Sequence, residues 1–223
     1  MLPILFENSH LVVIDKPQPM DFHDDQGVPG VHSRLKQQLG LTQLYPVHRL
    51  DKITSGLLLF AKTETACQAL NLAFESHEVE KYYLAISKDK PKKKQGKICG
   101  DMERARRGAW KLLKSQHNPA VTQFFSYSLT PGVRLFLLKP RTGRTHQLRV
   151  AMKSLGAPIL GDSLYAGQPS DRVYLHAYAM RFSLFGEEYT FVQAPVQGEV
   201  FNTAQMEAFT TDMTTPWALP WPK

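Results

Sequence analysis

The 223-residue sequence has only two cysteines, Cys67 and Cys99, which lie far apart. Neither is part of a Cys-x-x-Cys pair, so a zinc ribbon is excluded and a disulfide framework is not supported. The eight histidines show no zinc-ligand spacing. We therefore expect a protein of the reducing cytoplasm that holds no metal.

Long apolar runs are also missing. No stretch reaches the roughly 18 apolar residues that a membrane helix needs. The first seven residues carry no basic side chain that would open a signal peptide. A glycine-rich nucleotide-binding loop is absent as well. These absences predict no membrane contact and no nucleotide cofactor.

Positive charge is unevenly distributed along the chain. Residues 182–222 contain no Lys or Arg and five acids, whereas residues 81–114 contain twelve Lys or Arg and three acids. The whole chain has a net charge of +7. A concentrated basic stretch attracts polyanions by steering and counterion release. A solvated basic loop without a partner explains a lone charge run equally well.

Apolar runs predict both strands and helices in a chain that is 43% hydrophobic. Thr63 resembles a helix N-cap, and a second helix fits the apolar spacing of residues 148–155 before Gly156. Short apolar or alternating runs predict strands at residues 10–15, 56–61, 82–86, 121–127, 133–139, 180–184 and 188–192. The strands at 121–127 and 133–139 are expected to pair around Thr130-Pro131-Gly132, and those at 180–184 and 188–192 to form a hairpin.

Strands outnumber helices, and most connections are short. The sequence therefore predicts one α+β domain over residues 1–223 with a mainly antiparallel sheet. Residues 17–30 are expected to form a loop, and the basic excursion 88–114 has some hairpin character. The tail 193–223 gives no assignable element. No coiled-coil pattern or additional apolar helix is present, which favours a monomer.

A polar segment, HRLDKITSG at residues 48–56, precedes the predicted strand at residues 56–61. The charges of Arg49 and Lys52 favour an ionised Asp51. An ionised carboxylate can act as a nucleophile or as a base. A capped turn with surface ion pairs explains the same local composition.

Arginines cluster ahead of the second predicted helix. The run RTGRTHQLR at residues 141–149 places three arginines beside a helix N-terminus, an arrangement that suits a phosphate. Arg149 lies one turn inside the helix, next to its apolar stripe. A partly buried arginine requires a carboxylate partner, for which Asp51 is a candidate. A helix start with solvated basic residues is the alternative.

A third segment, EKYYLA at residues 80–85, lies in a predicted strand. Alternation places Lys81 and Tyr83 on one face and Tyr82 on the other. A tyrosine beside a cleft can stack on a base. Most strand tyrosines instead pack in the core or across strands.

Taken together and in this order, the three segments resemble the motifs of the RluA-type pseudouridine synthases, which modify ribosomal and transfer RNA. Residues 48–56 are similar to the catalytic-aspartate motif, residues 81–85 to the tyrosine motif and residues 143–149 to the third motif. The likeness extends from about residue 10 to residue 192, and the joint presence of the motifs makes it specific. Further similar features are Gly161-Asp162, Tyr165 and Leu175-His176-Ala177.

The resemblance implies a mixed, mainly antiparallel central sheet flanked by helices, with an RNA-binding cleft. It implies an enzyme that isomerises uridine to pseudouridine in structured RNA without a cofactor. Asp51 would be the catalytic carboxylate and Arg149 would orient it. Tyr83 would stack on the uracil, and Arg49 would fill the space that the flipped uridine leaves. The residues expected to contact RNA are His48, Arg49, Arg144, His146, Lys92, Lys93, Lys94, Arg106 and Arg107.

The sequence departs from the family pattern at residues 18–23, where a small residue, a glycine and an apolar stretch are usual. No S4 RNA-binding domain fits before residue 10. RNA recognition is therefore expected to come from the catalytic domain, with residues 88–114 as an added contact surface. Two rival functions are an RNA-binding or chaperone module without activity and a base-removing glycosylase. Retaining glycosidases usually need a second carboxylate nearby, which neither the Asp51 motif nor the Arg149 motif supplies.

Overall fold

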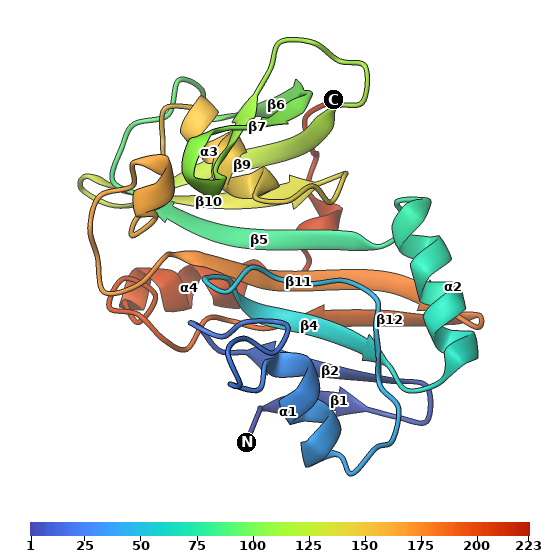
Figure 1. Cartoon of the computed structure of the whole chain (residues 1–223). Helices are drawn as coiled ribbons and strands as arrows, with labels where there is room; N and C mark the ends of the chain where they lie inside the picture. The colour runs from blue at the N-terminus through green and yellow to red at the C-terminus, as the bar shows by residue number, and fades with distance from the viewer. The chain divides into compact units, whose positions relative to one another are not determined.

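The computed structural model describes all residues, 1–223 (Figure 1). The chain divides into two compact units. Unit 1 comprises Met1–Glu80 and His176–Ala194, and unit 2 comprises Lys81–Leu175 and Pro195–Lys223. The expected single catalytic domain over residues 1–223 stays a prediction.

Unit 1 is built on strands in the order β1-β2-β4-β11-β12, with β3 paired to β4. The β4–β11 pair is parallel and the other pairs are antiparallel. The predicted strands at residues 10–15 and 56–61 are confirmed to within one residue, and the predicted hairpin of residues 180–192 is confirmed with a first strand that begins five residues earlier. The strands are β1 (Ile4–Glu7), β2 (Leu11–Lys16), β3 (Tyr45–Pro46), β4 (Ser55–Ala61), β11 (Leu175–Leu184) and β12 (Glu187–Val192).

Two helices accompany the unit 1 strands. Every residue of β2 and β4 is buried, and their apolar runs at residues 11–14 and 57–61 suit central strands. Helix α2 (Glu64–Glu75) begins at the predicted cap, because the Thr63 hydroxyl accepts the Ala66 N–H at 3.2 Å. Helix α1 (Val31–Gln38) was not predicted; it begins after Gly30 without a side-chain cap.

Unit 2 is built on strands in the order β5-β10-β9-β6 (Figure 1). Strands β7 and β8 pair in a separate hairpin. The predicted pairing of β9 and β10 is confirmed. The excursion 88–114 does contain a hairpin, but part of it is β6, which pairs with β9. The strands are β5 (Glu80–Ser87), β6 (Gln95–Gly100), β7 (Met102–Arg104), β8 (Trp110–Leu112), β9 (Ala120–Thr130) and β10 (Val133–Pro140).

Helix α3 (Gln147–Ser154) lies where the apolar spacing predicted a helix, and Gly156 follows it at φ 78°. The tail forms a fourth helix, α4 (Ala204–Asp212), which no sequence signal had revealed. Beyond it, Trp221 packs 5.0 Å from the Phe125 ring centre. The buried Lys139 ammonium lies 5.1 Å from the Tyr82 ring centre and 5.7 Å from that of Trp221. The tail thus completes the core of unit 2.

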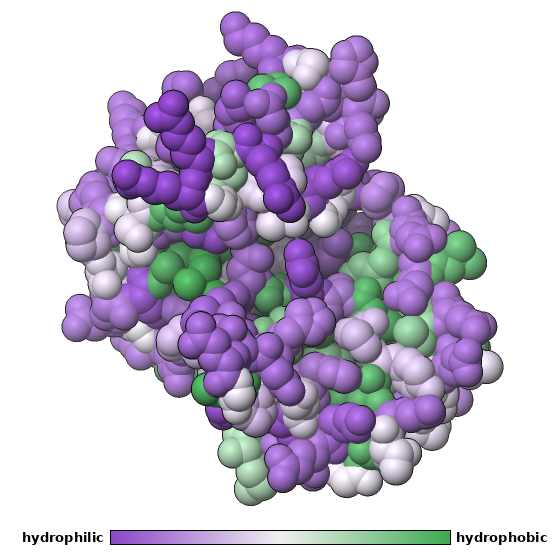
Figure 2. All heavy atoms as spheres, in the orientation of Figure 1, coloured by the Kyte–Doolittle hydropathy of each residue, from purple (hydrophilic) through white to green (hydrophobic).

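The strands and four α-helices confirm the expected α+β fold with a mixed, mainly antiparallel sheet. None of the helices has the length and apolarity to cross a bilayer. Strongly hydrophilic side chains gather over the upper part of the face in Figure 2, where Figure 1 shows β6, β7 and β9. This is the region of the basic excursion.

Candidate catalytic and RNA-binding residues

Hydrogen bonds from Lys16 hold the loop that carries Asp51. This lysine is fully buried at the end of β2. Its ammonium donates to the carbonyl oxygens of Pro17 at 3.2 Å, Lys52 at 3.2 Å and Thr54 at 2.8 Å. The Thr54 N–H in turn donates to the Asp51 carbonyl at 3.0 Å. A buried ammonium therefore stabilises the turn that follows the half-buried Asp51.

The segment that departs from the family pattern contacts this same loop. The Met20 N–H donates to the Lys52 carbonyl at 3.1 Å. The Lys52 ammonium forms an exposed ion pair with Asp21 at 2.6 Å. This hydrogen bond to Asp21 raises the pKa of Lys52. Lys52, one of the two cations expected to favour an ionised Asp51, is thus paired with Asp21.

The start of β4 is tied to β11 by a buried histidine. The Ser55 hydroxyl lies 2.8 Å from His176 Nδ1, and His176 Nε2 lies 2.8 Å from the Gln193 carbonyl. Gly56 has φ 106°, and a Cβ there would lie 2.3 Å from the Ala177 carbonyl oxygen. Only glycine permits this close approach of the two backbones. The His176 motif therefore has a structural role beside the Asp51 loop.

His48 and Arg49 precede the aspartate and differ in their surroundings. His48 Nε2 accepts the Leu59 N–H at 3.0 Å, and its ring stacks on Phe74 of α2 at 4.9 Å. The accepting Nε2 places the ring proton of a neutral His48 on Nδ1. Arg49 is exposed. His48 thus helps to hold the loop, and its expected contact with RNA stays a prediction.

Arg149 has a carboxylate partner that the sequence did not single out. Its Nε and Nη2 donate to the two Asp162 carboxylate oxygens at 2.7 and 2.8 Å. Both side chains are buried, at 8% and 2% exposed. The guanidinium also lies 4.8 Å from the Tyr165 ring centre. Gly161-Asp162 with Tyr165, noted only as a family likeness, therefore forms the support of Arg149.

The same tyrosine holds the start of α3. The Tyr165 hydroxyl lies 2.8 Å from His146 Nδ1 and accepts the Trp110 N–H at 3.0 Å. His146 is the residue before α3 and adopts a left-handed conformation, φ 56° and ψ 17°. The expected RNA contact of His146 stays a prediction, and its ring has this structural role as well.

The loop before α3 is fixed on β9 by a buried glutamine. Gln147 Nε2 donates to the Val121 carbonyl and the Thr122 hydroxyl, each at 3.0 Å. Its Oε1 accepts the Thr142 hydroxyl at 2.7 Å and the Arg144 N–H at 3.0 Å. A fully used side-chain amide of this kind rigidifies the loop. The loop is therefore well placed to present exposed groups to a ligand.

The remaining motif residues of unit 2 divide into buried and exposed groups. Tyr83 on β5 is buried, at 9% exposed. Burial lowers the pKa of Lys81, whose ammonium lies 3.9 Å from where a Gly143 Cβ would stand. The exposed Arg144 guanidinium donates to the Asn118 side chain. The other expected RNA contacts, all exposed, are Lys92, Lys93 and Lys94 in the β5–β6 connection and Arg106 and Arg107 between β7 and β8.

Asp51 belongs to unit 1, whereas Tyr83 and Arg149 belong to unit 2. Their expected meeting around a uridine stays a prediction. Cys67 and Cys99 are free thiols. No group of three or more His, Cys, Asp or Glu side chains is arranged to hold a metal ion.

Comparison with known proteins places the chain in a family. A family model described as RNA pseudouridylate synthase matches residues 10–154. An uncharacterized RNA pseudouridine synthase from Haemophilus influenzae is 46% identical over 200 residues, 89% of each chain. The ribosomal large subunit pseudouridine synthase C of Rickettsia bellii is 34% identical over 83% of this chain and 65% of the relative. The tRNA pseudouridine synthase C of Pasteurella multocida is 32% identical over 89% of each chain.

Solved structures agree with these relatives. Human RNA pseudouridylate synthase domain containing 4 superimposes with a TM-score of 0.74 at 26% identity, over 92% of this chain and 93% of that one. The chain therefore belongs to the RluA-type RNA pseudouridine synthases and is an isomerase that acts on RNA.

Proposed function

We propose that Asp51 is the carboxylate through which this synthase isomerises uridine in ribosomal or transfer RNA. The observation that carries the proposal is the family match over residues 10–154, a range that contains the Asp51, Tyr83 and Arg149 motifs in order. The hydrogen bonds from Lys16 to the Asp51 loop support the proposal, because a reacting group must be held in a defined geometry.

The reaction rearranges bonds within one nucleotide. The bond between uracil N1 and ribose C1′ breaks, the base turns, and C5 bonds to the same C1′. The proton on C5 leaves and N1 ends with a proton, so the composition does not change. Two roles fit an ionised Asp51: attack on C1′ or removal of a neighbouring sugar proton. Neither role needs an electron or group donor, which supports catalysis without a cofactor.

The supporting roles follow the family motifs. We assign Arg149 to the orientation of Asp51 and Tyr83 to stacking on the detached uracil. Arg49 is assigned to the space that the flipped uridine leaves in the RNA. Extrusion of the base costs a few kcal/mol, and this cost is lowest for a base in a loop or bulge. The fixed Arg149–Asp162 pair supports this assignment, because an orienting guanidinium must itself be immobile.

RNA is the substrate class, and both ribosomal and transfer RNA are supported by the names of relatives. Such substrates favour action in the cytoplasm, and we propose that the enzyme acts as a monomer. The net charge of +7 supports binding to a polyanion. The residues assigned to RNA contact are His48, Arg49, Arg144, His146, Lys92, Lys93, Lys94, Arg106 and Arg107.

The decisive test replaces Asp51→Asn, which keeps the size of the side chain and removes its charge. Pseudouridines are mapped in RNA from cells that lack the gene after incubation with each purified protein. We expect the wild type to create one or more new sites and the variant to create none, with RNA affinity within about threefold of wild type. The affinity is expected to persist because phosphate contacts supply most of it.

Asp212→Asn, an exposed change on α4, serves as the matched control and should retain wild-type activity. New pseudouridines at wild-type rate with the Asp51→Asn protein would refute the catalytic role. If the wild type itself made none in any RNA, the chain would act as a binding module on the same fold.

A further inference from the structure

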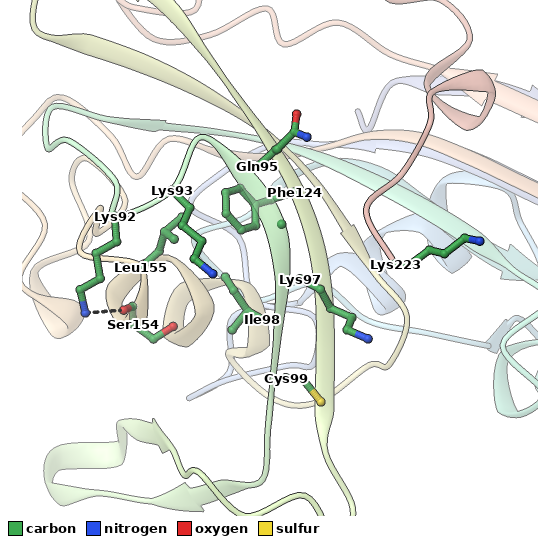
Figure 3. A pocket seen from close by; sticks show the side chains of 11 residues that line it. Lys92, Lys93, Gln95, Lys97, Ile98, Cys99, Phe124, Ser154, Leu155 and Lys223 are labelled. Carbon is green, nitrogen blue, oxygen red and sulfur yellow. Dashed lines mark hydrogen bonds between the residues drawn. The ribbon is translucent and has the colours of Figure 1, made fainter.

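A lysine-lined pocket of about 540 Å³ lies on unit 2, at the edge strand β6 (Figure 3). Lys92, Lys93, Lys97 and Lys223 line it, and no acidic residue does. This volume lies within the usual range for small-molecule sites. The pocket is thus large enough for a nucleotide and carries a charge that favours an anion.

The pocket has an apolar floor as well as a basic rim. The half-buried Ile98 of β6 contributes to it, and the buried Phe124 of β9 and Leu155 after α3 lie behind. Gly96 pairs with Phe124 across the strands, and a Cβ at Gly96 would lie 3.6 Å from the ring. The absence of a side chain there leaves room above the ring edge. Figure 3 shows Lys93 and Lys97 extending on either side of Ile98.

On the side of the pocket next to α3, a lysine offsets the negative charge of the helix C-terminus. A helix C-terminus carries a partial negative charge that would repel a phosphate. Here the Lys92 ammonium donates to the Ser154 carbonyl at 3.3 Å and so offsets the negative charge of the helix end. The Lys92 N–H donates to the Leu155 carbonyl at 3.0 Å, which fixes the segment on the helix end. Lys92, one of the four lysines of the rim, is therefore anchored to the end of α3.

The location suits RNA that also passes the start of α3. Ser154 is five residues after Arg149 on the same helix. At 1.5 Å per residue the two lie about 7.5 Å apart along the axis. A strand could thus contact both ends of α3.

We propose that this pocket binds the sugar-phosphate backbone of an unpaired segment of the RNA substrate, as an anchoring site additional to the one that isomerises uridine. The proposal rests on the proposed function, since it takes RNA as the ligand. Lysines around an apolar floor match an unpaired nucleotide, which offers phosphate charge and an apolar base or sugar face. It adds Lys97 and Lys223 to the expected RNA contacts and leaves Lys94 outside the pocket.

The charge contribution is tested with a double variant, Lys93→Gln with Lys97→Gln. RNA affinity is measured against salt concentration with total transfer RNA and total ribosomal RNA from cells that lack the gene. We expect weaker binding and a salt slope that is less steep by about 1.4, at about 0.7 per lost contact with a single strand. Lys88→Gln with Lys90→Gln is the matched control, because both residues are exposed in the same segment but do not line the pocket.

An equal decrease in the salt slope for both double variants would show that the segment acts as diffuse charge and would overturn the pocket proposal. An unchanged slope in the Lys93/Lys97 variant would overturn it too. Flattening by the pocket pair alone is the supporting result.

A second measurement uses the native cysteines and alters no charge. Cys99 lines the pocket, whereas Cys67 lies on α2 of unit 1, and both thiols are partly exposed. Alkylation of each cysteine by a neutral maleimide is followed by mass spectrometry, with and without saturating RNA. We expect RNA to slow the alkylation of Cys99 at least fivefold more than that of Cys67. Equal rates at Cys99 with and without RNA would contradict the proposal.

The footprint is made on the Asp51→Asn protein, so that the RNA stays unmodified. An active Asp51→Asn variant would refute the catalytic assignment and would leave the result of the Cys99 alkylation measurement unaffected. An inactive variant whose Cys99 is not protected would refute the pocket alone. The two proposals therefore fail in distinguishable ways.

Discussion

At the scale of single residues, the buried pair of Arg149 and Asp162 is the feature with the clearest energetic consequence. Two charges removed from water are tolerated only when their geometry is good and they are further hydrogen-bonded. The bidentate contacts at 2.7 and 2.8 Å and the Tyr165 ring meet this requirement. The pair fixes the guanidinium that we assign to the orientation of Asp51.

Asp162→Asn should leave the Arg149 charge uncompensated in a buried site. We expect the free energy of unfolding, measured by urea titration, to fall by about 3 kcal/mol. At a temperature where the variant is folded, kcat should fall about 10- to 100-fold with little change in KM, because misorientation affects the chemical step.

Glu103→Gln is the matched control for this change. Glu103 pairs with Lys111 at 3.1 Å, and both side chains are more than half exposed. Its loss should cost less than about 1 kcal/mol and leave kcat at the wild-type value. A folded Asp162→Asn protein with wild-type kcat would show that the pair is only structural.

At the scale of elements, the position of the Asp51 loop depends on the buried ammonium of Lys16 at the end of β2. Lys16 donates to three backbone carbonyls, those of Pro17, Lys52 and Thr54, and these contacts do not depend on which side chains the loop carries. A backbone acceptor that loses a buried donor becomes unsatisfied, at a cost of about 1–3 kcal/mol, and of the three bonds only that to Thr54 is fully buried. The geometry of Asp51 should therefore respond to residue 16.

Lys16→Met preserves the length of the side chain and removes the donor. We expect a loss of about 2–3 kcal/mol in the free energy of unfolding and a reduced kcat in the folded protein. Lys62→Met is the comparison, since Lys62 forms a more exposed pair with Glu7 in the same unit. Should both variants lose the same stability and keep full activity, the role of Lys16 in positioning the loop would be wrong.

The elements also show what local sequence conveys. Helix α2 was predicted from its Thr63 cap, and β9 and β10 from their alternation around a turn, because these signals lie within the segments themselves. Strand β6 carries a glycine-rich, polar sequence, QGKICG, and is a strand because β9 pairs with it. Pairing of this kind depends on a distant partner, so no local pattern reveals it.

At the scale of the whole molecule, buried tyrosines make stability sensitive to alkaline pH. Burial, with a hydrogen bond to Asp171, raises the pKa of Tyr174 to about 12, and burial raises that of Tyr178 to about 12. A raised folded pKa means that the neutral phenol is favoured in the folded state. The resulting stabilisation is complete below the ordinary pKa of 10.0 and is lost as pH rises toward about 12.

Tyr178→Phe tests this without removing aromatic bulk. The phenolate absorbance of the folded protein is titrated for wild type and variant, and the difference is the Tyr178 ionisation. We expect that difference to appear near pH 12, and the wild-type free energy of unfolding to fall between pH 10.0 and 12 more steeply than that of the variant. A difference centred near pH 10 would contradict the effect of burial.

The sequence by itself determined the family, the α+β class and the motif residues Asp51, Tyr83 and Arg149, because motif spacing and apolar periodicity are properties of the linear chain. Only the tertiary structure decided that Asp162 supports Arg149, that Lys16 holds the Asp51 loop and that lysines line a pocket at β6. These relations join residues from separate elements. Their energies depend on burial and direct contact, which arise only when the chain packs.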